Sequence, residues 1–279
     1  MYTIKSVVIS LFFLVLIAWS GKVFSDSHIK LYAMDCGTLD VSDMRDFSDT
    51  GKYDGQKIKL ANPCFLIRHA KGDLLWDTGY IDSMADNSNG VINGVWHSRL
   101  RVRLIDQLDQ IGVSPNEIEY LSLSHLHPDH SGNANKFSDS TFIVNELERK
   151  YMFSDQIKSM FGAYYSLLED AKTVSFKIEY DVFNDGTVLI KSMPGHTPGS
   201  SVLLIRLEKT GNVLLSGDLY IHAKGRELKT MLKYNSDKQL TIDSRKKFEA
   251  LAIKESARVI IQHEKRDFDL LPKFPKFLD

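Results

Sequence analysis

The sequence predicts a mixed α/β fold in which β-sheets are covered by helices on their outer faces. Short apolar segments of strand length alternate along the chain with segments of amphipathic helical periodicity. The chain has 279 residues and is 43% hydrophobic, which is enough to bury the core of one large domain. The formal net charge is −1, with no long run of like charges, so the sequence gives no indication of a nucleic-acid surface. We therefore expect a small-molecule substrate.

The first 25 residues predict a secretory signal peptide. Met1–Lys5 gives a short basic start, Ser6–Trp19 is almost wholly apolar, and Val23–Ser25 suits cleavage before Asp26. The apolar run is shorter than the roughly 20 residues of a membrane-spanning helix. We expect residues 26–279 to form the mature domain, periplasmic or secreted and free of the membrane after cleavage. An uncleaved N-terminal membrane anchor is the alternative.

The first half of the mature chain predicts strands followed by a helix. Lys30–Met34 is a predicted strand, and Pro63–Arg68 and Asp73–Asp77 form a predicted hairpin with Gly72 in its turn. The interval 78–98 is rich in Asn, Gly, Ser and Asp and predicts a long surface loop. Arg99–Gln110 predicts an amphipathic helix that Gly112 ends.

The second half of the chain also predicts strands together with helices. It contains two predicted helical regions, Asn145–Glu169 and Ile242–Lys254. The predicted strands are Thr141–Val144, Thr187–Met193, Ser201–Leu207, Val213–Ser216 and Arg258–Gln262.

The only two cysteines, Cys36 and Cys64, lie in apolar, strand-like contexts. An exported protein can form a disulfide, but buried free thiols fit these contexts equally well. The sequence leaves the two states open, as it does the question of a homodimer. Neither cysteine is near the histidine-rich segment described next, so we do not expect a thiolate metal ligand.

The segment His125–His130 has the sequence H-L-H-P-D-H and holds four metal-competent side chains in six residues. Imidazole and carboxylate together are the ligand set of hydrolytic transition-metal sites. Pro128 keeps the preceding histidine out of the helical region. This density of ligands predicts a metal centre.

The local structure predicted around this segment separates its ligands into two pairs. Ile118–Ser124 is a predicted buried strand, so His125 and His127 project from the same side of its extended end. Asp129 and His130 follow on a turn into a predicted short helix, where they can face a second metal.

Three later predicted strands also end at a metal-competent residue. His196 follows the strand 187–193 in the sequence P-G-H-T-P-G, Asp218 follows 213–216, and His263 follows 258–262. Catalytic groups converge at strand ends because the sheet is stiff and the loops beyond it are free to vary. Together with His125–His130 these residues offer seven ligands for two metals.

These motifs resemble those of the metallo-β-lactamase superfamily, whose pattern is H-x-H-x-D-H followed by a distant His, Asp and His. The match begins at Asp77-Thr78-Gly79 and runs to His263. The resemblance implies a four-layer αββα sandwich with two zinc ions per chain. It also implies that Asp77 orients a ligand by a hydrogen bond. The implied ligands are His125, His127 and His196 for the first metal, Asp129, His130 and His263 for the second, and Asp218 bridging both.

Within the superfamily, the chain is similar to the N-acyl homoserine lactonase group. The similarity lies in segments 30–37, 62–67 and 258–263. Two positions depart from the pattern of that group. Pro128 replaces a bulkier apolar residue, and Ile221 stands where the group has its substrate-contacting tyrosine, with Tyr220 one position earlier.

The resemblance implies a hydrolase that opens an ester or lactone by attack of a metal-bridging hydroxide. The expected substrate is an N-acyl homoserine lactone, so the expected role is quorum quenching. We expect Asp129 to carry a proton to the leaving alkoxide. Tyr220 is a candidate hydrogen-bond donor to the oxyanion, with packing at a strand end as the alternative.

Four other functions use a similar fold or ligand set. They are a thioester hydrolase resembling glyoxalase II, a β-lactamase, a di-iron redox protein and a non-catalytic metal-binding module. The redox proteins generally have a glutamate where His127 stands, so the histidine favours hydrolysis. An intact ligand set with an open coordination position favours an enzyme over a binding module.

Overall fold

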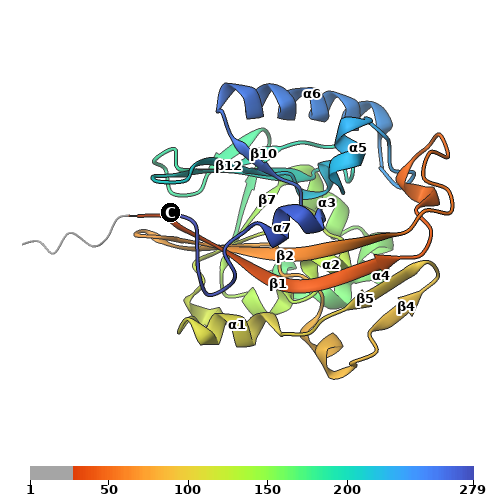
Figure 1. The fold of residues 1–279 in the computed structure, drawn as a ribbon. Coiled ribbons are helices and arrows are strands. Elements are labelled where there is room, and N and C mark those ends of the chain that lie inside the picture. Colours follow the sequence, from red (N-terminus) through yellow and green to blue (C-terminus); the bar gives the residue numbers. More distant parts are fainter. Residues whose placement is uncertain (1–27) are drawn as a thin grey trace, which may run out of the picture.

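The computed structural model describes residues 28–279. The predicted signal peptide, residues 1–25, lies outside the described residues. Two β-sheets face each other, and helices cover the outer face of each, as Figure 1 shows. Together these make the four layers of the predicted αββα sandwich.

The first sheet has eight strands in the order β4-β5-β1-β2-β3-β6-β7-β8. The strands from β4 to β3 pair antiparallel, whereas β3, β6, β7 and β8 run parallel. Their bounds are β1 Lys30–Val41, β2 Ile58–His69, β3 Gly72–Trp76, β4 Val91–Asn93, β5 Trp96–Arg99, β6 Tyr120–Ser122, β7 Thr141–Asn145 and β8 Thr173–Phe176.

The second sheet has five strands in the order β13-β12-β11-β10-β9. All neighbours are antiparallel except β12 and β13, which run parallel. The bounds are β9 Glu179–Asp181, β10 Val188–Ser192, β11 Ser201–Leu207, β12 Gly211–Leu215 and β13 Arg258–Ile260.

Helices α1, α3 and α4 lie against the outer face of the first sheet, and α6 covers the second. The α-helices are α1 Leu104–Gln110, α2 Pro128–Ser131, α3 Glu146–Met152, α4 Asp155–Tyr165, α5 Ala223–Glu227, α6 Lys238–Lys254 and α7 Lys265–Asp269. Short 3₁₀ helices are η1 Arg45–Phe47, η2 Asp82–Asp86, η3 Pro115–Glu117, η4 Ala134–Phe137, η5 Ser166–Glu169 and η6 Gly217–Leu219.

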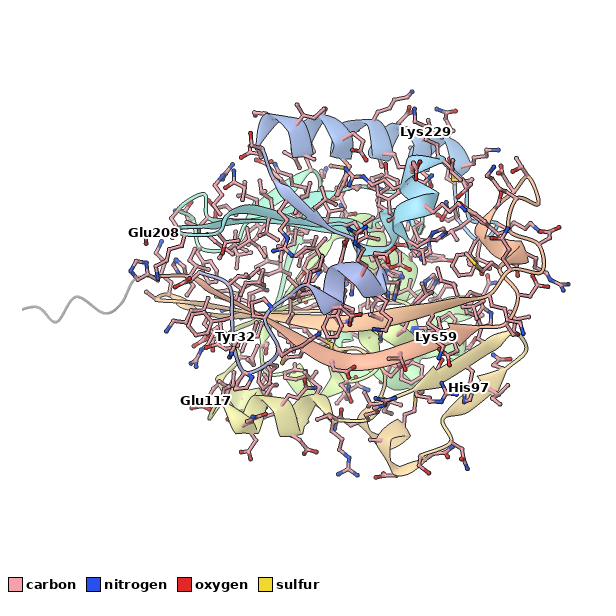
Figure 2. All side chains as sticks on the ribbon, in the orientation of Figure 1. Tyr32, Lys59, His97, Glu117, Glu208 and Lys229 are labelled. Atoms are coloured by element: carbon pink, nitrogen blue, oxygen red, sulfur yellow. A yellow bond between two sulfur atoms is a disulfide. The ribbon has the colours of Figure 1, made fainter. Side chains whose placement is uncertain are left out.

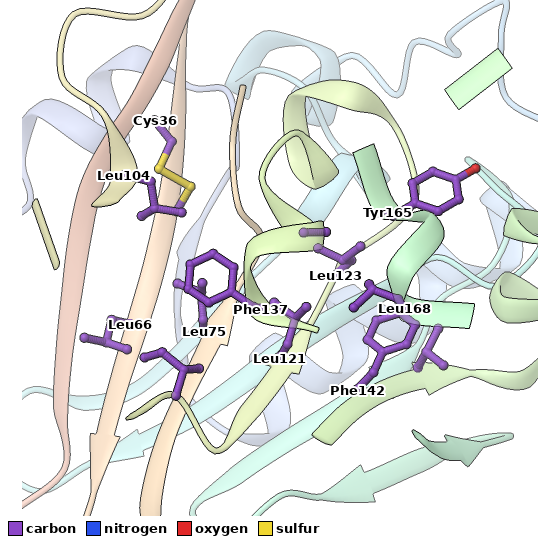
Figure 3. Packing of buried hydrophobic residues seen from close by; sticks show 14 of the residues in the cluster. Cys36, Leu66, Leu75, Leu104, Leu121, Leu123, Phe137, Phe142, Tyr165 and Leu168 are labelled. Atoms are coloured by element: carbon purple, nitrogen blue, oxygen red, sulfur yellow. A yellow bond between two sulfur atoms is a disulfide. The ribbon is translucent and has the colours of Figure 1, made fainter. Parts of the chain in front are cut away.

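Successive side chains of a central strand point to opposite faces of its sheet, and in these strands both sets are apolar and buried. In β2, Leu66 points to the helical layer, whereas Phe65 and Ile67 point to the layer between the sheets. Figure 3 shows Leu66 in the helix-side cluster together with Leu121 and other residues. The side chains of Phe65, Leu66 and Ile67 are all fully buried. These near-continuous apolar strands are typical of sheets covered on both faces.

The predicted loop over residues 78–98 is wrong in part. It contains the 3₁₀ helix η2 and the hairpin of β4 and β5. Strand β1 continues to Val41, seven residues beyond the predicted end at Met34, and its outer edge pairs with β5, so that Val41 faces Trp96. The predicted helix start at Arg99 is also wrong, because Arg99 belongs to β5 and α1 begins at Leu104.

Cys36 and Cys64 form a disulfide between β1 and β2, which answers the question that the sequence left open. Figure 3 shows the bond beside Leu104 in the helix-side cluster. It also packs against Gly79, where an added Cβ would lie 2.2 Å from the Cβ of Cys36. The bond therefore supports the loop that follows β3.

Glu148, in the first turn of α3, connects two loops that carry predicted metal ligands. Its buried carboxylate accepts hydrogen bonds from the Leu126 amide (3.0 Å), the Thr197 hydroxyl (2.7 Å) and the Gly199 amide (3.0 Å). Leu126 lies between two histidines of the H-x-H segment, and Thr197 follows His196. Burial raises the pKa of Glu148 to about 7, and the three donors oppose this shift.

Charged side chains such as Lys59, Glu117, Glu208 and Lys229 lie exposed at the periphery, as Figure 2 shows. Within residues 28–279, no helix combines the length and the apolar character that crossing a bilayer requires.

Removal of the disulfide by the double substitution Cys36→Ala, Cys64→Ala is expected to lower the free energy of unfolding by about 3 kcal/mol. The reason is that the bond closes a loop of moderate length in the unfolded chain. Urea unfolding of the variant, the parent and the parent in reductant measures the change. Equal midpoints for all three samples would contradict the prediction.

Glu148→Ala leaves two amides and a hydroxyl without their acceptor in a buried place, so we expect a loss of about 2–4 kcal/mol in the free energy of unfolding. Glu148→Gln retains an acceptor oxygen and is expected to lose less. Urea unfolding compares the two variants. The exposed residue Glu146, on the same helix, provides the matched control Glu146→Ala, and a loss as large as that of Glu148→Ala would argue against the connecting role of Glu148.

Candidate metal centre

The seven predicted ligands meet at one edge of the sandwich. His125–His130 follows β6 of the first sheet, and His196, Asp218 and His263 follow β10, β12 and β13 of the second. The two sheets are joined beside these loops, because the Ser201 amide donates to the Ser124 carbonyl at 2.8 Å. The predicted short helix also forms, as α2, and begins directly after His127.

The first group of ligands, called site A, consists of His125, His127 and His196. The Nδ1 atom of His127 lies 2.8 Å from Nε2 of His125 and 3.1 Å from Nε2 of His196. Three imidazole nitrogens therefore converge on one point.

The second group, called site B, consists of Asp129, His130 and His263. The Nε2 atoms of the two histidines are 3.3 Å apart. Each lies 3.7 Å from Oδ2 of Asp129. Two imidazoles and one carboxylate oxygen thus face a second point.

Asp218 lies between the two groups and offers one carboxylate oxygen to each. Its Oδ2 is 3.5 Å from Nε2 of His196 and 3.8 Å from Nε2 of His125, in site A. Its Oδ1 is 3.1 Å from Nε2 of His263 and 3.3 Å from Nε2 of His130, in site B. This geometry suits the bridging role that the family resemblance implied for Asp218.

Hydrogen bonds behind the ligands fix which ring nitrogen faces the centre. The Nδ1 atom of His130 donates to Oδ2 of Asp77 (3.0 Å), that of His196 to Oδ1 of Asn235 (3.0 Å), and that of His263 to the Ala61 carbonyl (2.8 Å). With the proton held on Nδ1, the Nε2 lone pair of each ring is free to bind a metal.

Asp77 has the orienting position predicted for it. It is fully buried directly after β3, and its φ of 60° is unusual for a residue other than glycine. Besides His130, its carboxylate binds the Ser124 amide (2.6 Å) and the Ser124 hydroxyl (2.9 Å). The hydrogen bonds hold the strained backbone and the histidine in one arrangement.

The donor set fits divalent transition-metal ions. Burial, followed by the neighbouring His196, lowers the pKa of His127 to about 4, so its ring is neutral at neutral pH. Neutral imidazole nitrogens are good ligands of such ions, and three of them converge at site A. Oδ1 of Asp218 is buried and has no hydrogen-bond partner, which is costly unless a cation compensates it.

The carboxylates favour positive charge at site B. Burial alone would lower the pKa of His130 and His263, but the Asp218 and Asp129 carboxylates act with other neighbouring groups to outweigh this effect and raise the pKa of both rings. The same histidines hold the pKa of Asp218 well below its usual range, although burial opposes this shift. A metal ion would provide the same compensation without a proton.

A cavity of about 270 Å³ opens above both sites. Its floor includes His127, Asp129 and Asp218, and Pro128 lies beside them. Its walls are mainly apolar and include Leu39, Phe47, Leu60, Trp96, Ile221 and Leu232. A ligand in this cavity would contact the metal centre with one end and apolar side chains with the other.

The prediction that Tyr220 donates to an oxyanion is wrong. Its hydroxyl donates to Oε1 of Glu249 at 2.8 Å, and its ring packs against Phe248 of α6. The backbone leaves η6 in an extended conformation, which directs Tyr220 into the layer between the second sheet and α6. Ile221, its neighbour, lines the cavity instead. The packing alternative is the one that the structure supports.

Several residues of the centre were missed by the sequence analysis. Tyr80 lines the cavity directly after the D-T-G segment and could have been suspected from that position. Trp96 lines the cavity because it belongs to β5, in the hairpin of β4 and β5 that the sequence did not predict. Asn235 and Glu148 belong to no sequence pattern, and only the folded chain brings them to His196 and its loop.

The chain matches the family model described as the metallo-beta-lactamase superfamily over residues 59–263. It is 29% identical over 268 residues to N-acyl homoserine lactonase AttM of Azorhizobium caulinodans, which covers 91% of this chain and 100% of the relative. It is 27% identical over 262 residues to an N-acyl homoserine lactonase of Bacillus thuringiensis, which covers 89% of this chain and 98% of the relative.

Solved structures share the fold. An N-acyl homoserine lactone hydrolase with the product N-hexanoyl-L-homoserine at its catalytic metal centre superposes with a TM-score of 0.77 and 23% identity, covering 90% of this chain and 100% of that one. AidC, a dizinc quorum-quenching lactonase, superposes with a TM-score of 0.63 and 18% identity, covering 89% of each chain. The family match spans most of the chain and includes all seven converging ligands. The chain therefore belongs to the metallo-beta-lactamase superfamily.

Proposed function

We propose that this protein is a dinuclear zinc hydrolase that opens the lactone ring of N-acyl homoserine lactones, and so quenches quorum signals. The observation that carries the proposal is the position of Asp218, whose two carboxylate oxygens face two separate ligand groups at the floor of one cavity. The similarity to N-acyl homoserine lactonases over about nine-tenths of the chain supports the substrate.

Two zinc ions suit these ligands. Site A offers three imidazoles, site B two imidazoles and a carboxylate, and neither includes a thiolate, because Cys36 and Cys64 are bonded to each other. When bound, the zinc ions would polarise an ester carbonyl and lower the pKa of a water molecule towards neutrality.

Asp129 is the residue to which we assign the proton for the leaving alkoxide. It lines the cavity, and its side chain keeps 22% of its surface exposed, unlike the buried ligands behind it. The side-chain Nδ2 of Asn62 donates to the backbone carbonyl of Asp129 at 2.8 Å, which fixes the backbone of Asp129. A carboxylate held there can accept a proton and pass it to the departing oxygen.

The apolar walls of the cavity suit the acyl chain. The tilted rings of Phe47 and Trp96 pack with their centroids 5.6 Å apart, and Trp96 also contacts the ring of Tyr234 at a centroid distance of 6.0 Å. An acyl chain buried against these side chains would contribute roughly 0.8 kcal/mol per methylene group. The lactone at the other end of the substrate would then lie over Asp129 and Asp218.

The purified, zinc-loaded protein is expected to hydrolyse acyl homoserine lactones faster than other lactones, a thioester or a β-lactam. Titration of the acid released, compared across this panel, measures the preference. Elemental analysis is expected to give two zinc ions per chain. Thioester or β-lactam turnover above that of all lactones, or iron with visible absorbance, would overturn the proposal.

Asp218→Asn and His127→Ala are expected to lower kcat/KM by roughly 10³-fold or more, because each removes a ligand worth several kcal/mol of transition-state stabilisation. Elemental analysis should show a parallel loss of zinc, with a soluble, folded protein. Asp139→Asn is the matched control, since Asp139 is exposed and outside the centre. Full activity of a zinc-free Asp218 variant would refute the two-metal mechanism.

We also propose that the protein is exported and that its signal peptide is removed. The Cys36–Cys64 bond supports this, since disulfides persist mainly in oxidising compartments. Expression of the full-length chain is expected to release a soluble protein beginning near Asp26, and N-terminal sequencing of the periplasmic and membrane fractions identifies the end. Recovery of an intact N-terminus from membranes would instead support the anchor.

A further inference from the structure

A hydrogen-bond donor in the cavity above the metal centre would stabilise the substrate oxygen that becomes negatively charged during ester hydrolysis, in addition to the metal ions. Tyr220 does not provide it, because its hydroxyl is bound to Glu249. Two other tyrosines, Tyr80 and Tyr234, line the cavity. The structure distinguishes between them.

The backbone and ring of Tyr80 are firmly positioned. The Tyr80 amide donates to the Cys36 carbonyl (3.3 Å), and the Tyr80 carbonyl accepts from Nδ2 of Asn133 (2.7 Å). The side chain is largely buried. Its ring lies so close to Gly37 that an added Cβ there would be 2.4 Å from Cδ2 of the ring. The ring thus occupies a space that exists because residue 37 is a glycine with a φ of +133°.

The hydroxyl of Tyr80 has a proton to donate. Oγ of Ser98 donates to the phenol oxygen at 3.0 Å, so this contact uses a lone pair of the phenol and leaves its own proton free. Across residues 28–279, the phenol donates to no protein acceptor. Ser98 also lines the cavity, which places the shared hydrogen bond at the cavity wall.

The surroundings keep this phenol protonated. Burial and then the carboxylates of Asp129 and Asp218 raise the pKa of Tyr80. Tyr80 lines the same cavity as these two carboxylates. At neutral pH the group is therefore a neutral donor.

Tyr234 is less fixed. It is 43% exposed, its ring contacts Trp96, and within the described part of the chain its hydroxyl forms no hydrogen bond with protein. Oriented donors contribute more to transition-state stabilisation than mobile ones, because they need not reorganise during the reaction. The geometry favours Tyr80.

We propose that Tyr80 is a further catalytic residue, which donates its phenol hydrogen bond to the ester oxygen that becomes negatively charged, while Ser98 positions the phenol. The proton stays on Tyr80 throughout, so no bond to the residue forms or breaks. This inference rests on the proposed lactone hydrolysis. It assigns to Tyr80 the donor that Tyr220 cannot provide.

The test uses the zinc-loaded enzyme and the best lactone of the panel. It compares Tyr80→Phe with Tyr234→Phe, the competing donor in the cavity wall, and with the matched control Tyr180→Phe, because Tyr180 lies in β9 outside the cavity. Tyr80→Phe keeps the ring and is expected to lower kcat roughly 10²-fold, with a change in KM below about threefold and unchanged zinc content. Tyr180→Phe is expected to stay within threefold of the parent in kcat, and Tyr234→Phe is expected to lose much less kcat than Tyr80→Phe.

A double-mutant cycle with Ser98→Ala tests the positioning role. Alone, Ser98→Ala is expected to lower kcat less than Tyr80→Phe does. Combined with Tyr80→Phe, it should cause no further loss, because Ser98 acts through the phenol. Parent-like kcat in Tyr80→Phe, or a large loss in Tyr234→Phe alone, would overturn the inference while leaving lactone hydrolysis established. A parent that hydrolyses no lactone would overturn the proposed function first, and the inference with it.

Discussion

The constraint on which the centre depends is the convergence of five imidazoles and two carboxylates, with Asp218 between the two ligand groups. Three imidazole nitrogens of site A face one another at 2.8 and 3.1 Å, and Oδ1 of Asp218 is buried without a hydrogen-bond partner. Such an arrangement is unfavourable without cations, because buried charge and lone pairs must be compensated. The rest of the fold holds these groups together, through the Asp77 and Glu148 carboxylates behind them and the joined sheets beneath.

The sandwich explains why ligands so distant in sequence can meet. Strands β6, β10, β12 and β13 all end at the same edge, and each is followed by a short loop or turn that carries one or more ligands. Both sheets are buried on two faces, so their strand ends are stiff supports. Part of the cavity wall comes from β5, through Trp96 and Ser98, and part from the region around Tyr234.

Much of this arrangement could be predicted from the sequence, because it depends on local patterns. The H-x-H-x-D-H segment, the strand ends before His196 and Asp218, and the buried hairpin of β2 and β3 all carry their own signals. What could not be predicted depends on tertiary partners. The strand β5 exists because β1 offers it an edge, and the direction of Tyr220 is set by its packing against α6. The residue composition of these segments predicts neither the strand pairing nor the direction of the side chain.

The bond between Cys36 and Cys64 has a consequence for how the enzyme matures. It packs against Gly79, which lies between Asp77, the residue behind His130, and Tyr80 in the cavity wall. The disulfide therefore supports residues 77–80, the stretch of chain that includes the Asp77 carboxylate behind His130. We therefore expect a chain with this bond already formed to hold its metal ligands closer to their final positions than the reduced chain does.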